Sequence, residues 1–159
     1  METNIHAHST NFIDLPNGGV FVADQQNNRY LGIKVDDINE GYKDRYVIQL
    51  MKAQHNGSSY LNTLSFRNPY NFTVLSLNNV TLDLCLDNAI FRYPANEKCG
   101  RILLISNAPY LYINDGLLIN LNNYEIHRDK VVNAIAFDQW RLVQNTDSKE
   151  IEVYSYSSE

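Results

Sequence analysis

Short apolar runs alternate with polar turns along the whole of this 159-residue chain. In the run Val80–Leu86 every second residue is aliphatic, and Thr, Asp and Cys stand between them. A period of two puts one kind of side chain on each face of a β-strand, so this run predicts a half-buried strand. Phe72–Leu77 precedes it, and the short turn Asn78-Asn79 predicts that the two runs form a hairpin.

A second hairpin is predicted in the C-terminal half of the chain. The apolar runs Tyr110–Ile113 and Leu117–Ile119 flank the turn Asn114-Asp115-Gly116. Asn, Asp and Gly tolerate positive φ angles and therefore close tight turns between antiparallel strands. Tyr, Ile and Leu in both arms suit a pleated surface with one buried face.

Further apolar runs bounded by turn residues complete the predicted set of strands. They are residues 12–15, 20–23, 30–35, 45–51, 60–66, 90–93, 101–106, 137–143 and 151–156. About 11 or 12 short antiparallel strands with no long amphipathic helix predict an all-β barrel or sandwich. Residues 1–11 are polar and predict a flexible N-terminal segment, and residues 12–159 are expected to form a single all-β domain.

The segment Asp129–Trp140 fits two structures. Asp129 suits the N-cap of a short helix near residues 129–136, with apolar residues on one face. The alternative is a loop followed by a strand at 137–143. At most one short helix, of no more than two turns, is therefore expected.

One order of elements recurs: a strand, a polar turn, and a strand that contains Tyr-Leu. Val20–Ala23 leads to Arg29–Ile33, Arg101–Ser106 leads to Tyr110–Ile113, and a degenerate middle copy is placed at 60–77. About four strands and about fifty residues per copy resemble the β-trefoil family, which includes the ricin-type lectins and trefoil protease inhibitors. The resemblance implies a β-trefoil-like barrel.

The residues that close a trefoil repeat depart from the family pattern. In ricin-type lectins a Gln-x-Trp motif or a related Trp closes each repeat. Here the motif reads Asp138-Gln139-Trp140, so Gln and Trp are adjacent, and it occurs once. A β-sandwich or jelly roll is therefore the alternative architecture, and an up-and-down barrel is the third.

The charge of the chain limits the classes of partner. The net charge is −5, and the chain has no dense cluster of Lys and Arg. Nucleic acids and anionic membranes need a concentrated basic face, so neither is expected as a partner. The N-terminal residues show no signal-peptide pattern, and no run approaches the roughly 20 apolar residues of a membrane span. A cytoplasmic location is expected, with secretion by an unconventional route as the alternative.

Sequence motifs for catalysis and metal binding are missing. The chain has no G-x-S-x-G and no Gly-rich phosphate loop before a helix. His6 and His8 suit a chelating pair on an extended strand, but the other histidines are remote in the sequence. Cys85 and Cys99 make neither a disulfide framework nor a zinc site, and whether they pair stays open. No enzyme activity, metal or cofactor is expected.

Tyrosine is the residue type that points to binding, with 11 Tyr against one Trp. A Tyr ring is flat and apolar with a hydrogen-bonding tip, which suits protein interfaces and the faces of sugars. Tyr110 and Tyr112 alternate with aliphatic residues, so they point to the same side of their strand. Together with the turn residues Asn114 and Asp115 they predict a shallow carbohydrate site.

Carboxylates provide a second candidate binding surface. Asp36 and Asp37 begin a predicted loop at 36–44 that is rich in acidic residues and suits a basic protein partner. The leading hypothesis is a non-catalytic, lectin-like protein that binds carbohydrate. The alternative is a protein-binding inhibitor or immunity-type factor, such as a protease inhibitor, and the minor alternative is a carboxylate-based hydrolase. The expected partner is a carbohydrate or a protein.

Overall fold

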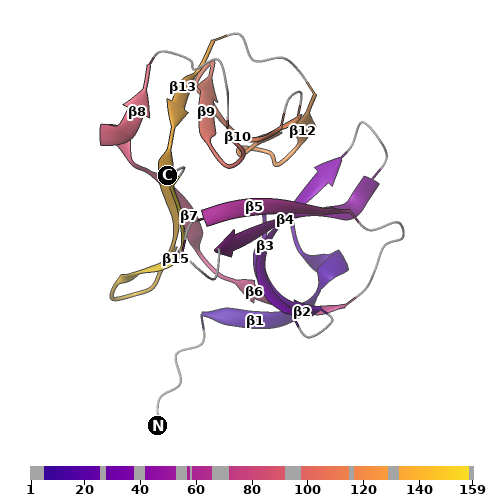
Figure 1. Ribbon diagram of the computed structural model, residues 1–159. Coiled ribbons are helices and arrows are strands. Elements are labelled where there is room, and N and C mark those ends of the chain that lie inside the picture. Colours follow the sequence, from indigo (N-terminus) through magenta and orange to yellow (C-terminus); the bar gives the residue numbers. More distant parts are fainter. Residues whose placement is uncertain are drawn as a thin grey trace.

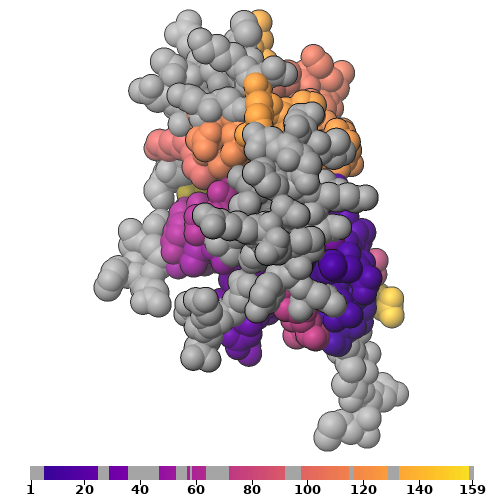
Figure 2. All heavy atoms as spheres, turned by 90° about the vertical axis from the view of Figure 1, so that its right-hand side faces the viewer, coloured from indigo at the N-terminus to yellow at the C-terminus, as the bar shows by residue number. Residues whose placement is uncertain are grey.

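Three antiparallel sheets make up the described part of the chain, and none of them closes into a barrel (Figure 1). The computed structural model describes residues 6–25, 28–37, 42–52, 57, 59–65, 72–91, 98–114, 117–128 and 133–157. The prediction of an all-β chain is confirmed. Seen from the side in Figure 2, the second sheet (salmon and orange) lies above the first (indigo to magenta).

The first sheet has the strand order β1-β6-β2-β3-β4-β5. Its strands are β1 (Ala7–Asn11), β2 (Val20–Gln25), β3 (Asn28–Asp37), β4 (Tyr42–Lys52), β5 (Ser59–Ser65) and β6 (Thr73–Leu77). Consecutive strands pair from β2 to β5, and β6 returns to pair with both β1 and β2. The polar residues 7–11 predict a flexible segment, yet they form β1, because backbone hydrogen bonds to β6 need no apolar pattern.

The second sheet has the order β12-β11-β10-β9-β13-β8, and the third has the order β15-β14-β7. The second contains β8 (Ala89–Ile90), β9 (Ile102–Ile105), β10 (Ala108–Asn114), β11 (Leu117–Asn120), β12 (Ile126–His127) and β13 (Ile135–Phe137). The third contains β7 (Val80–Leu84), β14 (Gln139–Asn145) and β15 (Glu150–Ser157). The predicted hairpin of β10 and β11 is confirmed, with Tyr110 opposite Asn120 and Tyr112 opposite Leu118.

The predicted hairpin of β6 and β7 is wrong. β6 pairs with β1 and β2, whereas β7 pairs with β14 in another sheet. Asn79 takes a positive φ of 54°, and the Gln144 side-chain amide donates a hydrogen bond to the Asn78 carbonyl at 3.1 Å. These two asparagines therefore turn the chain from one sheet into the next. Leu86 also leaves the predicted strand, since it begins the short 3-10 helix η3 (Leu86–Asn88) and is 73% exposed.

Residues 12–15 form the 3-10 helix η1 (Phe12–Asp14) and its exit instead of the predicted strand. The Lys34 ammonium donates hydrogen bonds to the carbonyls of Phe12 (3.1 Å), Ile13 (3.2 Å) and Leu15 (2.9 Å). Lys34 is 1% exposed, so its charge is solvated by these carbonyls rather than by water. This contact anchors η1 over the outer face of the first sheet, where Phe12 packs against Phe21.

The predicted loop at 36–44 and the short helix considered near 129–136 both differ from the structure where it describes them. Asp36 and Asp37 end β3 and residues 42–44 begin β4, so these parts of the predicted loop at 36–44 are strand, and residues 38–41 lie outside the described residues. Of the short helix considered near 129–136, residues 129–132 lie outside the described residues, and Ile135–Phe137 forms strand β13. Its backbone pairs with β8 and β9, which an isolated sequence window does not reveal.

Side chains from all three sheets meet in one hydrophobic core. Its most completely buried members include Val35, Ile48, Ile102, Leu111 and Ile119. Burial of an aliphatic side chain of this size contributes roughly 1.5–3 kcal/mol, so the contact between the sheets stabilises the whole domain.

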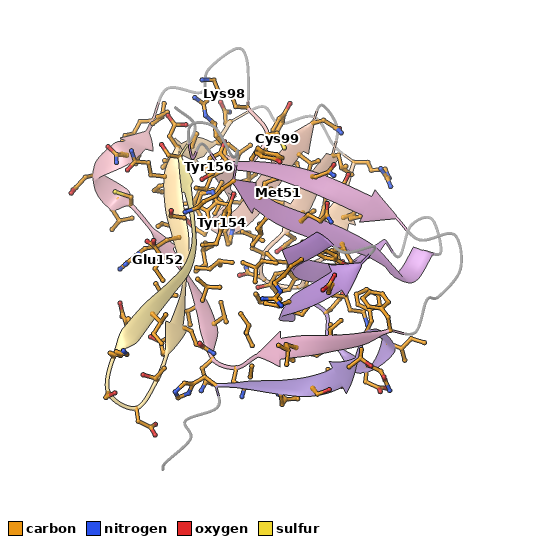
Figure 3. All side chains as sticks on the ribbon, turned by 60° about the horizontal axis from the view of Figure 1, so that its bottom comes forward. Met51, Lys98, Cys99, Glu152, Tyr154 and Tyr156 are labelled. Carbon is orange, nitrogen blue, oxygen red and sulfur yellow. The ribbon has the colours of Figure 1, made fainter. Side chains whose placement is uncertain are left out.

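Two tyrosines of β15 tie the third sheet to the other two. The Tyr154 hydroxyl donates to the carbonyls of Met51 (3.2 Å) and Tyr60 (3.3 Å), which belong to the first sheet. The Tyr156 hydroxyl donates to the Cys99 carbonyl at 2.7 Å, just before the second sheet. Figure 3 shows both tyrosines beside Met51 and Cys99. Burial raises the pKa of Tyr154 to about 12, which keeps this hydroxyl a hydrogen-bond donor at neutral pH.

Candidate functional site

An apolar pocket of about 430 Å³ lies where the three sheets meet. The first sheet supplies Val20 and Ile33, the second Ile102, Leu104, Pro109 and Leu111, and the third Val80, Leu82, Leu84, Trp140 and Leu142. Leu121, Asn122 and Tyr124 line it from the turn between β11 and β12, and Gly18 and Thr81 complete it. Apolar pockets of roughly 300–1,000 Å³ are typical of small-molecule sites.

The alternation in β7 accounts for one wall of this pocket. Val80, Leu82 and Leu84 line the pocket, while Asp83 between them is exposed and pairs with Arg141. The three aliphatic residues pack against the core yet are only partly buried. Apolar surface in contact with water costs roughly 25 cal/mol per Å², so covering these side chains favours binding of an apolar molecule.

The turn between β11 and β12 carries the polar groups at the rim. Its backbone is held by hydrogen bonds from the Asn120 N–H to the Glu125 carbonyl (2.9 Å) and from the Tyr124 N–H to the Asn120 carbonyl (2.6 Å). The Asn122 N–H donates to the Asn120 side-chain oxygen at 2.8 Å. Asn122 is exposed and Tyr124 is half-buried, so both reach from the solvent to the pocket.

The Tyr124 ring lies in direct contact with Gly18 at the edge of the pocket. Tyr124 has a φ of 58°, which is rare for a bulky residue, and Gly18 has a φ of 82°. A Cβ atom on Gly18 would lie 2.1 Å from the Tyr124 Cε2 atom, so only glycine leaves room for the ring. This contact joins the turn before β2 to the second sheet. Burial raises the pKa of the Tyr124 hydroxyl.

The described residues that line the pocket include no Asp, Glu, Lys, Arg or His. Thr81 lies among them, but its neighbours Val80 and Leu82 face the pocket, and its hydroxyl accepts a hydrogen bond from the Asn145 side chain at 3.1 Å. The polar side chains left at the rim are Asn122 and Tyr124. The site thus combines an uncharged apolar body with two neutral hydrogen-bonding groups.

The outer face of the third sheet carries a second hollow, of about 440 Å³. Asp83, Arg141 and Glu152 line it, together with Cys85, Gln139 and the serines of β15, and with Leu84, Trp140 and Tyr156. The Arg141 guanidinium donates to the Asp83 carboxylate at 2.8 Å. Two of the charged residues that line this hollow, Asp83 and Arg141, therefore pair with each other.

The predicted carbohydrate site does not coincide with the pocket. Tyr110 and Tyr112 point to the same side, as expected, and both pack in a small cluster with Leu103 and Leu118 on the other face of the second sheet. Tyr112 is only 7% exposed and offers little surface to a ligand. Tyr110 is partly exposed, and its neighbour is His127, whose ring meets it edge to face at 5.4 Å between centroids.

The structure describes three of the other four predicted residues. Asn114 ends β10 and is exposed, and Asp115 lies outside the described residues. Asp36 and Asp37 belong to the end of β3, in the first sheet, where the structure describes only their backbone. Within the described chain, Asp36 and Asp37 therefore belong to a different sheet from Tyr110, Tyr112 and Asn114.

The pocket residues have a weak signal in the sequence. The alternation of Val80–Leu86 predicts one buried face, but no local pattern shows that the face is left uncovered. Leu121–Tyr124 reads as an ordinary turn, and its position opposite Gly18 depends on the meeting of two sheets. Asn122 and Tyr124 were therefore not identifiable as site residues from the sequence.

Cys85 and Cys99 are both free thiols in the structure. No group of three or more His, Cys, Asp or Glu residues within the described ranges is arranged to hold a metal ion. The described ranges also contain no helix of the length and apolar character needed to cross a membrane. No protein-family model matches this chain, and none of the curated proteins with which it was compared matches it in sequence.

Proposed function

We propose that this protein is a non-catalytic binding protein that holds a small, mainly apolar molecule in the pocket between its three sheets. The observation that carries the proposal is the row Val80, Leu82 and Leu84, which faces a space of about 430 Å³ and is only partly buried. A ligand in this space covers apolar surface that the folded chain leaves uncovered.

A neutral apolar dye such as N-phenyl-1-naphthylamine tests the proposal. The chain has a single Trp, and Trp140 lines both this pocket and the outer hollow, so quenching of its fluorescence and transfer to the dye report binding at either, and a variant in the pocket distinguishes them. Leu82→Phe enlarges a side chain inside the pocket and is expected to weaken dye binding about tenfold or more, because the ring takes the ligand's place. Leu86→Phe, at a residue that is 73% exposed, is the matched control and leaves binding unchanged. Equal affinities of the two variants would contradict the proposal.

Carbohydrate binding at Tyr110 is the second candidate, favoured by the polar groups around this ring. The Asn120 side-chain amide lies 3.4 Å from the Tyr110 hydroxyl. The His127 Nε2 atom is buried and has no hydrogen-bond partner among the described residues. A ring, an amide and an imidazole side by side suit stacking and hydrogen bonding to a sugar. Glycan-array binding that is lost in Tyr110→Ala and kept in Leu82→Phe would support this candidate instead.

The finer architecture and the protein-inhibitor alternative stay predictions. The three sheets contain six, six and three strands in the described chain, and neither the β-trefoil resemblance nor the sandwich alternative enters the proposal. Capture of a basic protein that free apolar ligands do not displace would favour the inhibitor alternative over the pocket.

A further inference from the structure

We infer that the ligand of the apolar pocket is an uncharged amphiphile, with one neutral hydroxyl, ester or amide group at the rim between Asn122 and Tyr124 and a hydrocarbon body against β7 and Trp140. This inference rests on the proposed function and adds the chemical class of the ligand.

The absence of charge in the lining argues against an ionic ligand. None of the described residues that line the pocket carries a charge. A carboxylate or ammonium group that enters such a pocket loses its hydration and gains no counter-ion. A fatty acid anion or an alkylamine is therefore disfavoured, whereas an alcohol, ester or amide gives up far less hydration.

The rim supplies both kinds of hydrogen-bonding group that a neutral head needs. The Asn122 side chain offers an amide donor and a carbonyl acceptor, and the Tyr124 hydroxyl both donates and accepts. The Tyr124 hydroxyl carries its proton at neutral pH, as an ordinary tyrosine does, and burial raises its pKa further. Neither side chain makes a hydrogen bond to another described side chain that would occupy it, although the Asn122 N–H is bonded to Asn120.

The position of these two groups is fixed before any ligand arrives. The turn that carries them is closed by backbone hydrogen bonds between Asn120 and Glu125 and between Tyr124 and Asn120. The Tyr124 ring lies against Gly18, where a Cβ atom would be 2.1 Å away. A rim that is already ordered loses little conformational entropy on binding, which favours recognition of a single head group.

Three ligands with the same chain test the charge of the head group: decan-1-ol, decanoate and decylammonium, titrated at pH 7 against Trp140 fluorescence. Decan-1-ol is expected to bind about tenfold or more tightly than either ion, because only the ions lose their hydration without compensation. If decanoate or decylammonium binds as tightly as decan-1-ol, the inference is overturned while the apolar site stands. If none of the three binds, the proposed function fails as well.

Two single variants test where the head group sits. Tyr124→Phe keeps the ring against Gly18 and removes only the hydroxyl, and Asn122→Ala removes the amide. Each is expected to weaken decan-1-ol binding about fivefold, the loss of one ordinary hydrogen bond, and to leave decane binding unchanged. Tyr110→Phe removes a hydroxyl on the other face of the second sheet and is the matched control, with no change expected. Unchanged decan-1-ol affinity in both rim variants would place the head group elsewhere and overturn the inference.

Discussion

The two faces of the β7–β14 pair hold hollows of nearly the same size, of which only one is lined by charged side chains. The inner hollow measures about 430 Å³ and is lined by aliphatic residues such as Leu82 and Leu142. The outer hollow measures about 440 Å³, and Asp83 and Arg141, which are adjacent to Leu82 and Leu142 in the sequence, line it together with Leu84, Trp140 and Tyr156. The strand pairing places Leu142 opposite Leu82 and Arg141 opposite Asp83, so the two leucines share one face and the two charged residues share the other.

This comparison shows that volume says little about what a hollow binds. Successive residues of a strand point to opposite faces, so one step along the sequence replaces an apolar side chain on one face with a charged side chain on the other. The inner face has uncovered apolar surface and no charge, and it is therefore the face with something to gain from an apolar ligand. On the outer face, Asp83 and Arg141 pair with each other across the strands.

A charge placed on the inner face is expected to have the largest effect on stability. Leu142 is 6% exposed, and Leu142→Asp puts a carboxylate in the core with no cation in the pocket lining to pair with it. We expect the free energy of unfolding to fall by about 4 kcal/mol or more, measured by urea denaturation. The mirror-image variant, Asp83→Leu on the outer face, is expected to fold with little change. Similar losses in both variants would remove the distinction between the faces.

The sequence predicted the parts of this fold that depend on neighbours in the chain. The hairpin of β10 and β11 follows from the apolar arms and the Asn-Asp-Gly turn, and β2 pairs with β3 as the polar turn between them implies. The inner and outer faces of β7 follow from its alternation alone. These features need no knowledge of what lies across the core.

The features that the sequence did not reveal depend on which sheets meet. Asn78-Asn79 has the same local pattern whether its strands pair or part, and here they enter different sheets. Phe12–Asp14 reads as a strand, but the buried Lys34 holds it as η1. The pocket needs residues from all three sheets, so no window of the chain contains its signal. Tyr112 was a candidate for binding because a Tyr on a strand has the same pattern whether water or a neighbouring side chain covers it.

High pH is expected to have the next largest effect on stability, through Tyr154 of β15. Burial raises the pKa of Tyr154 to about 12, whereas an unfolded tyrosine ionises near 10. Its contribution to stability is fully present below pH 10 and is lost as the pH rises toward 12, at about 1.4 kcal/mol for each pH unit, because the unfolded chain gives up the proton first.

Urea denaturation across this pH range separates Tyr154 from its neighbours. Tyr154→Phe is expected to flatten the fall in unfolding free energy, while part of the fall remains because burial also raises the pKa of Tyr30 to about 12. Ser155→Ala, at the adjacent position of β15, introduces and removes no ionisable group and leaves the slope as it is. A slope that Tyr154→Phe does not change would show that this hydroxyl reaches solvent in the folded protein.

Glycine substitutions sharpen the account of the pocket rim with a smaller effect. Gly18→Ala places a methyl group against the Tyr124 ring and forces alanine into a φ of 82°, and we expect a loss of about 1–3 kcal/mol in urea denaturation. Gly57→Ala is the matched control, since Gly57 has a φ of 68° with nothing within 4 Å of the added atom. The excess loss in Gly18→Ala measures the ring contact alone. Equal losses would mean that the backbone angle, and not Tyr124, explains why glycine is needed there.

The smallest expected effect belongs to the outer face. The hydrogen bond with Asp83 raises the pKa of Arg141, yet the two side chains are 43% and 51% exposed, so water and salt screen their attraction. In a double-mutant cycle of Asp83→Asn and Arg141→Gln, we expect a weak coupling at low ionic strength that disappears in about 1 M NaCl. A coupling that persists in high salt would mean that the pair in the outer hollow is shielded from water and ions. In that case charge pairing, and not only solvation, would set the difference between the two faces.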